Sequence, residues 1–119
     1  MPASQGTPKP LEEVAGVLQR SGAACHDLAS SAEWLQDQLS SLVDAGKIQP
    51  CRETMMAMQE LDRISQVLRG LGDLNCELAV YTPDAWAPSD RLASAARLDS
   101  LAARIVYAQM PGNVEDEFW

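Results

Sequence analysis

Apolar side chains recur at alternating intervals of three and four residues along two long stretches of the chain. Such spacing collects side chains on one face of an α-helix, whereas a half-buried β-strand requires strict alternation. The sequence therefore predicts two long amphipathic helices, each with an apolar seam. The first seam comprises Leu11, Val14, Leu18, Ser21, Cys25, Leu28, Ala32, Leu35, Leu39 and Leu42. The second comprises Ala57, Leu61, Ile64, Leu68, Leu71, Asn75 and Leu78.

A short turn is expected between the two helices. Gly46 suits a helix C-terminus and Pro50 suits the first turn of the following helix. Two long helices joined in this way form an antiparallel hairpin. Their apolar stripes are too wide to be covered by each other alone, so we expect a homodimer in which two hairpins form a four-helix bundle.

A third, shorter helix is expected over residues 89–109. Pro88 breaks the preceding pattern, and Ser89 or Asp90 is a candidate N-cap. Pro111 is expected to end the third helix. With 119 residues and few β-branched or aromatic side chains, the chain is predicted to be all-α, a long antiparallel hairpin with this third helix beside it.

The two ends of the chain differ from the middle. Residues 1–10 contain three prolines and are expected to be a disordered leader, followed by a helical domain over 11–110. Residues 111–119 form an acidic tail that ends in two aromatic side chains. The first residues lack the apolar stretch of a signal peptide, and no apolar segment is long enough to span a membrane. A cytoplasmic location is therefore expected.

Charge and cysteine content exclude several classes of function. The net charge of −8 opposes binding to nucleic acid or to an anionic membrane, and it favours a protein partner with basic patches. Cys25, Cys51 and Cys76 lack the spacing of a zinc site and are expected to be reduced. We therefore expect neither a metal site nor a cofactor of its own.

Polar residues of the second helix suggest a site. Asp62 and Gln66 are four residues apart, which places them on one outward face, one turn from each other. Gln59 lies on the same side with Arg63 beside it. The same pattern is also typical of the solvated face of any amphipathic helix, so spacing alone leaves both interpretations open.

The run from Met55 to Gln66 resembles the active-site helix of the CheZ-like and CheT-like chemotaxis phosphatases. The signature of that family is Asp-x-x-x-Gln on the outer face of a long helical hairpin, and here Asp62 and Gln66 match it. The resemblance implies that Gln66 orients a water for attack on the aspartyl phosphate of a CheY-type response regulator. It implies that Asp62 meets a lysine of the regulator, and that the regulator supplies Mg²⁺.

Further contacts with the regulator are expected around this motif and at the C-terminus. Gln59 and Arg63 are candidate partner-binding residues beside the motif. CheZ also ends in a short acidic and apolar segment that binds the regulator, so the resemblance extends to the tail. Its candidate binding residues are Glu115, Asp116, Glu117, Phe118 and Trp119. The resemblance also leaves room for contact with another chemotaxis protein.

Two alternatives remain open. His26-Asp27-Leu28 resembles the start of the phosphoacceptor box of histidine kinase dimerisation helices, which would imply histidine phosphotransfer through His26. An ordinary surface histidine is the other interpretation of His26. The second alternative is a non-catalytic chemotaxis adaptor that binds an enzyme through its acidic surface.

Overall fold

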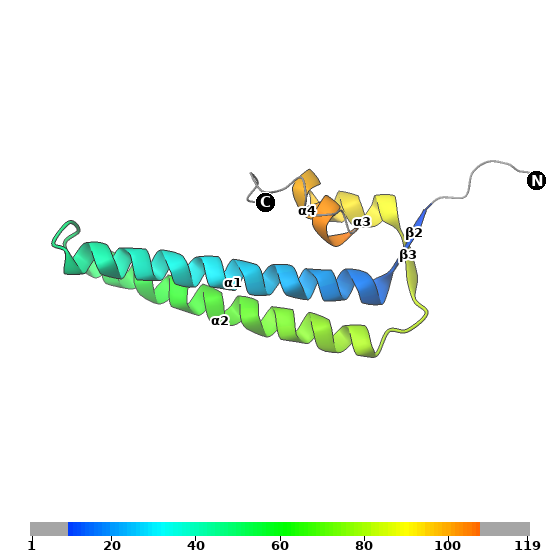
Figure 1. The fold of residues 1–119 in the computed structure, drawn as a ribbon, viewed down its shortest axis with the longest axis horizontal. Helices are drawn as coiled ribbons and strands as arrows, with labels where there is room; N and C mark the ends of the chain where they lie inside the picture. Colours follow the sequence, from blue (N-terminus) through cyan, green and yellow to red (C-terminus); the bar gives the residue numbers. More distant parts are fainter. Residues whose placement is uncertain (1–9, 108–119) are drawn as a thin grey trace, which may run out of the picture. The chain divides into compact units, whose positions relative to one another are not determined.

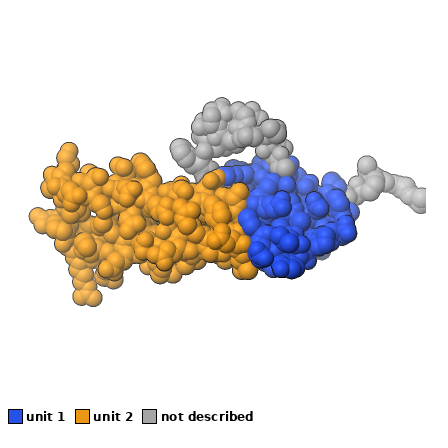
Figure 2. Space-filling model, turned by 60° about the horizontal axis from the view of Figure 1, so that its bottom comes forward, with its two compact units in different colours: residues 1–21, 75–119 blue, residues 22–74 orange. Residues whose placement is uncertain are grey.

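The structure, a computed structural model, describes residues 10–107 and confirms the all-α class (Figure 1). Two compact units divide the chain: unit 1 comprises 1–21 and 75–119, and unit 2 comprises 22–74 (Figure 2). The expected leader, except Pro10, and the acidic tail lie outside the described residues. The described elements are β2 (Leu11–Glu13), α1 (Val14–Asp44), α2 (Arg52–Val80), β3 (Trp86–Pro88), α3 (Ser89–Ala96) and α4 (Asp99–Ile105).

Unit 2 is the expected antiparallel hairpin, formed by residues 22–44 of α1 and 52–74 of α2. Gly46 has a φ of +75°, and its N–H donates to the carbonyl of Val43 at 3.0 Å. The N–H of Lys47 donates to the carbonyl of Leu42 at 2.9 Å. These two bonds form a Schellman motif, which confirms Gly46 as the helix stop. Pro50 precedes α2 instead of lying in its first turn.

Small residues, rather than leucines, form the contact line between the two helices of unit 2. Gly22, Ala29 and Ala32 are buried on α1, and Ser65 and Gly72 are buried on α2. The seam residues Leu61, Leu68 and Leu71 were expected to point at the partner helix. They lie beside the contact line instead of on it. Periodicity locates the apolar half of a helix. Within that half, the two helix backbones come closest where the side chains are small.

The closest approach in unit 2 is at Gly72. A methyl group at this position would lie 2.6 Å from Cδ2 of His26 and 2.8 Å from the carbonyl oxygen of Gly22. Both distances are shorter than van der Waals contact. Gly72 is therefore required by the packing of α2 against α1.

Leucines and other apolar side chains of unit 2 lie to one side of the small-residue line. Residues on a helix are separated by about 100°, so Arg69 and Leu71 lie on opposite sides of Gly72 and Ser65. Arg69 contacts Glu33 of α1, so the Arg69 side of α2 and the Glu33 side of α1 form one face of the hairpin. Leu35, Val67 and Leu71 are on the other side and are 45–47 % exposed. We call this the apolar flank; it consists of Leu28, Leu35, Leu42, Ile64, Val67 and Leu71.

Unit 1 contains a two-stranded antiparallel sheet that the sequence did not predict. Leu11 pairs with Pro88, and Glu13 pairs with Trp86. The expected helix start at Leu11 is therefore wrong, because Leu11–Glu13 are extended and α1 begins at Val14. Strands of three residues are too short to produce a recognisable alternation.

The expected third helix over 89–109 is divided into α3 and α4. Arg97 has a φ of +72°, which interrupts the helix without any glycine or proline to signal it. The predicted cap is also shifted, since Pro88 occupies the N-cap position and Ser89 begins the helix. Because of the break, residues 89–105 form two short helices that contact each other.

Arg20 of α1 binds the C-terminus of α4 within unit 1. Its Nε donates to the carbonyl oxygen of Ile105 at 2.6 Å, and a terminal nitrogen donates to that of Val106 at 3.2 Å. A guanidinium at the negative end of a helix satisfies carbonyls that have no further turn to bond to. Val106 beside this cap is 2 % exposed, so the end of α4 is part of the core of unit 1.

The two polar residues placed in the seams are partners. Asn75 Nδ2 donates to Ser21 Oγ at 2.8 Å in unit 1. The sequence placed each residue on the inner face of its helix but contained no sign of their pairing. Their hydrogen bond satisfies two polar groups in a half-buried position, where an unpaired group would be destabilising.

Substitution of the two α2 glycines should test the small-residue contact. Gly72→Ala should lower the free energy of unfolding by about 1–3 kcal/mol, because α1 must move to accept the methyl group. A methyl group at Gly70 would meet no neighbouring atom within 4 Å, so Gly70→Ala should raise stability by about 0.5–1 kcal/mol through helix propensity. Urea unfolding of both variants measures the difference. Equal effects would contradict a close contact at Gly72.

Candidate functional site

Asp62 and Gln66 lie together on the exposed surface of α2. Gln66 Nε2 donates a hydrogen bond to Asp62 Oδ2 at 2.8 Å. The helix places the two side chains one turn apart, as their spacing predicts, and the hydrogen bond restricts the rotation of both. The carboxylate and the amide therefore form one exposed polar pair within unit 2.

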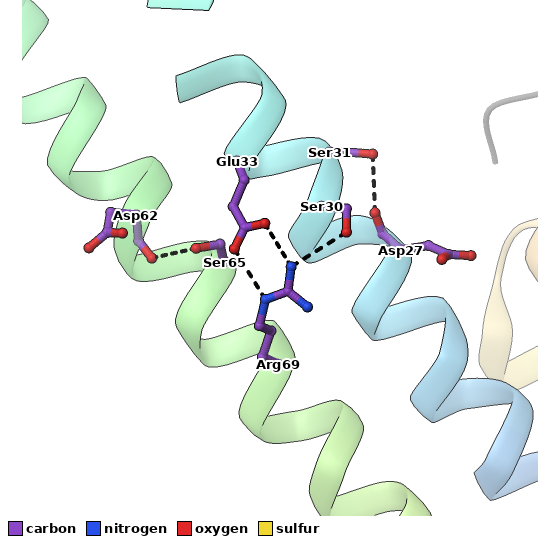
Figure 3. Close-up of polar contacts among 7 residues, drawn as sticks. All are labelled: Asp27, Ser30, Ser31, Glu33, Asp62, Ser65 and Arg69. Atoms are coloured by element: carbon purple, nitrogen blue, oxygen red, sulfur yellow. Dashed lines mark hydrogen bonds and ion pairs between the residues drawn. The ribbon is translucent and has the colours of Figure 1, made fainter. Parts of the chain in front are cut away.

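Ser65 determines the direction of this pair. Its side chain faces α1 and the residue is only 2 % exposed, while its hydroxyl donates to the backbone carbonyl of Asp62 at 2.8 Å (Figure 3). With Ser65 directed inwards, the helical repeat turns Asp62 and Gln66 outwards, on the side opposite the apolar flank. The small hydroxyl side chain is suited to this position because a larger group would separate the helices.

Arg69 links α2 to α1 on the same side of the hairpin. Its guanidinium donates to both carboxylate oxygens of Glu33, at 3.1 and 2.7 Å, and to Ser30 Oγ at 3.4 Å (Figure 3). The hydrogen bond from Arg69 lowers the pKa of Glu33, and the same contact raises the pKa of Arg69. This cross-link lies three residues beyond Gln66, so it holds the part of α2 that carries the pair.

His26 is engaged in a contact between the helices. Its Nε2 lies 3.0 Å from Asp73 Oδ1, and its ring covers Gly72. A phosphoryl group on Nε2 would displace the carboxylate of Asp73 and repel it. The geometry of His26 therefore matches a structural histidine at the surface of the hairpin.

The candidate partner-binding residues beside the pair are also at the surface. Gln59 is exposed. Arg63 forms an ion pair with Glu60 on the same helix, which lowers the pKa of Glu60 and raises that of Arg63. The remaining candidates, Glu115, Asp116, Glu117, Phe118 and Trp119, lie outside the described residues.

Sequence reasoning missed the cross-link of Arg69, Glu33 and Ser30. Each residue occupies a polar position of an amphipathic helix, and nothing in the sequence states which residue of one helix is opposite which residue of the other. Arg69 is three residues after Gln66, a spacing that places both on neighbouring parts of one helix face. This spacing is the only sequence signal that could have added Arg69 to the candidate site. Trp34 of α1 is also exposed.

A family model described as "Domain of unknown function (DUF8776)" matches residues 10–117, which include every described helix and strand. The chain belongs to the DUF8776 family. No curated protein and no solved structure matches this DUF8776 chain. Its candidate site must therefore be interpreted from the geometry of its own residues.

The part of the DUF8776 chain that the structure describes contains neither a candidate metal site nor a candidate membrane-spanning helix. Within residues 10–107, no group of three or more His, Cys, Asp or Glu side chains is arranged to hold a metal ion. None of the helices in that range has the length and apolar character needed to cross a bilayer.

The cross-link should make the stability of the DUF8776 hairpin depend on the ionisation of Glu33. A carboxyl whose pKa is lowered by folding stabilises the folded state above its unfolded pKa, and this contribution is lost as the pH falls through the folded pKa. Glu33→Gln should therefore melt below the unmodified protein at pH 7, and the gap should narrow below about pH 4.3. Thermal unfolding followed by circular dichroism measures the melting temperatures of the two proteins at each pH.

A double-mutant cycle provides the control for this prediction. In an Arg69→Gln background, Glu33→Gln has no guanidinium to lose and should leave the melting temperature unchanged. An undiminished effect in that background would assign the destabilisation to something other than the contact between Glu33 and Arg69.

Proposed function

We propose that this protein accelerates hydrolysis of the aspartyl phosphate of a CheY-type response regulator. The observation that carries the proposal is the exposed pair of Asp62 and Gln66, joined at 2.8 Å on the outer side of a long hairpin. This exposed position on the hairpin supports the proposal, because the resemblance to CheZ-like phosphatases implies a motif on an outer helix face. The substrate and the Mg²⁺ belong to the regulator, which agrees with a site in this chain that consists of one carboxylate and one amide.

The proposed reaction is an in-line attack of water on phosphorus. The phosphorus–oxygen bond to the regulator's aspartate breaks, inorganic phosphate forms, and the aspartate leaves as a carboxylate. Gln66 holds the attacking water through its amide, which offers both a donor and an acceptor. Since phosphoryl transfer requires mainly positioning and charge stabilisation, a neutral amide is sufficient for this part of the site.

Asp62 has two roles in the proposal. One carboxylate oxygen accepts the hydrogen bond from Gln66 and fixes the orientation of the amide. The carboxylate can also accept a charge-assisted hydrogen bond from the regulator's lysine, which places the phosphoryl group in line with the water. A single residue thus couples recognition of the regulator to the orientation of Gln66.

The surroundings of the pair support a protein substrate. Gln59 and Arg63 extend the polar surface of α2 by one turn, where they would contact the regulator. The tail over 111–119 would add a second contact, with Phe118 and Trp119 as anchors and its acidic side chains directed at a basic patch. The proposal includes a cytoplasmic location, where response regulators act.

The apolar flank supports a homodimer in the same proposal. Leu35, Val67 and Leu71 of this flank are nearly half exposed in unit 2, and burial of such side chains is the main favourable term in association. A second copy packed on this flank would complete a four-helix bundle. Asp62 and Gln66 lie on the opposite side, so two copies would each keep an open site.

Replacing Gln66 by alanine should separate activity from folding. Loss of one well-placed polar group at a site of this kind typically lowers the rate by about 10²-fold or more, whereas alanine is tolerated at an exposed helix position. Gln66→Ala should therefore nearly abolish phosphate release from a CheY-type receiver charged with acetyl phosphate. Asp62→Asn should weaken both binding and release. Phosphate release is followed in single-turnover assays.

Gln19→Ala, which changes another exposed helix glutamine, is the matched control and should release phosphate at the unmodified rate. If Gln66→Ala were as fast as the unmodified protein, the phosphatase proposal would fail and the adaptor hypothesis would be preferred. Labelled phosphate retained on His26 would instead support histidine phosphotransfer.

The apolar flank should be needed for self-association. At micromolar concentration, light scattering should give the mass of a dimer for the unmodified protein and of a monomer for Leu71→Asp, because the new charge would be buried without a partner. Leu98→Asp changes an exposed leucine of unit 1 outside the flank and should leave the dimer intact. A monomeric unmodified protein would contradict the proposed bundle.

A further inference from the structure

Trp34 is an exposed tryptophan in the middle of α1. The residue is 59 % exposed, and the residues one turn before and after it, Ser30, Ser31, Asp37 and Gln38, are all polar. Leu28, Leu35 and Leu42 of the apolar flank repeat at intervals of seven, and Trp34 is rotated by about 100° from that row. The tryptophan therefore does not belong to the surface assigned to a second copy.

The surface around Trp34 is continuous with the site on α2. Glu33 precedes Trp34, and Ser30 is one turn before it; both side chains accept hydrogen bonds from Arg69 (Figure 3). Arg69 in turn is three residues beyond Gln66 on the same side of α2. Because residues four apart share a helix face, a continuous strip of unit 2 extends from Gln66 through Arg69 and Ser30 to Trp34.

The charge of this part of α1 indicates the kind of partner. Residues 22–44 contain four acidic side chains, Asp27, Glu33, Asp37 and Asp44, and no lysine or arginine. A tryptophan on a helical segment with acidic side chains and no lysine or arginine is complementary to an apolar patch with a basic border. Tryptophan is also among the residues most often responsible for the affinity of protein interfaces.

We propose that Trp34 is the apolar anchor on α1 for the regulator whose aspartyl phosphate is placed at Gln66. This inference rests on the proposed function and adds a specificity-determining residue to it. The regulator would cover both helices, with its lysine and phosphoryl group at Asp62 and Gln66 and an apolar patch on Trp34. Trp34 touches no reacting atom, so it contributes to binding and leaves the chemical step to Gln66.

The test compares Trp34→Ala with Trp86→Ala. The two tryptophans are equally exposed, at 59 %, but Trp86 lies in β3 of unit 1. Single-turnover phosphate release is measured over a range of concentrations of a CheY-type receiver charged with acetyl phosphate. Trp34→Ala should raise the half-saturating concentration by about 10–100-fold with the maximal rate nearly unchanged, as expected for a hot-spot residue. Trp86→Ala should leave both unchanged.

Fluorescence gives a second readout that does not depend on catalysis. In a Trp86→Phe, Trp119→Phe background, Trp34 is the remaining tryptophan of the chain, and its emission should shift to shorter wavelength when the receiver is bound with beryllium trifluoride in place of the phosphoryl group. Unchanged emission together with unchanged half-saturation in Trp34→Ala would overturn the anchor while leaving a Gln66-dependent phosphatase intact. A Trp34-dependent shift without any phosphate release would retain the anchor and reject the phosphatase.

Discussion

The contact of Gly72 with Gly22 and His26 is the constraint on which the arrangement of unit 2 depends. At this point α2 approaches α1 so closely that a single methyl group would overlap both a ring and a backbone oxygen. Helices held at such a distance can adopt few relative registers, because any slip would bring a larger side chain into the contact. The pairs His26 with Asp73 and Arg69 with Glu33 are formed in the register that results.

Close packing by small residues also gives the hairpin two different sides. With Ser65 and Gly72 directed at α1, the helical repeat turns Asp62, Gln66 and Arg69 to one side and leaves Ile64, Val67 and Leu71 on the other. One side is polar and crossed by a bidentate ion pair, while the other is apolar and nearly half exposed. The proposed catalytic surface and the proposed self-association surface therefore use different residues of the two helices.

The charges around Asp62 and Gln66 are compatible with the proposed site. The chain is acidic, and a carboxylate in place of Gln66 would repel a phosphoryl group; the amide avoids this while keeping a donor and an acceptor. The guanidinium of Arg69 reduces the negative charge next to the pair through its contact with Glu33. Within the described residues Asp62 forms no ion pair, which suits it to the lysine of the proposed partner.

The sequence by itself determined the local features of the protein. Apolar spacing located two long helices, Gly46 located the end of the first, and the interval of four residues placed Asp62 beside Gln66. All of these depend on interactions within one or two helical turns, where residue spacing and geometry are directly related. The seams even placed Ser21 and Asn75 on inner faces, although not as a hydrogen-bonded pair.

Only the tertiary structure decided which residues meet across the chain. The strand pairing of Leu11–Glu13 with Trp86–Pro88, the break at Arg97 and the cap that Arg20 places on α4 join positions far apart in sequence or oppose local propensity. The choice of glycine, alanine and serine instead of leucine for the contact between α1 and α2 likewise depends on how closely two surfaces can approach. Periodicity describes one helix at a time, and the register between two helices is a property of both surfaces together.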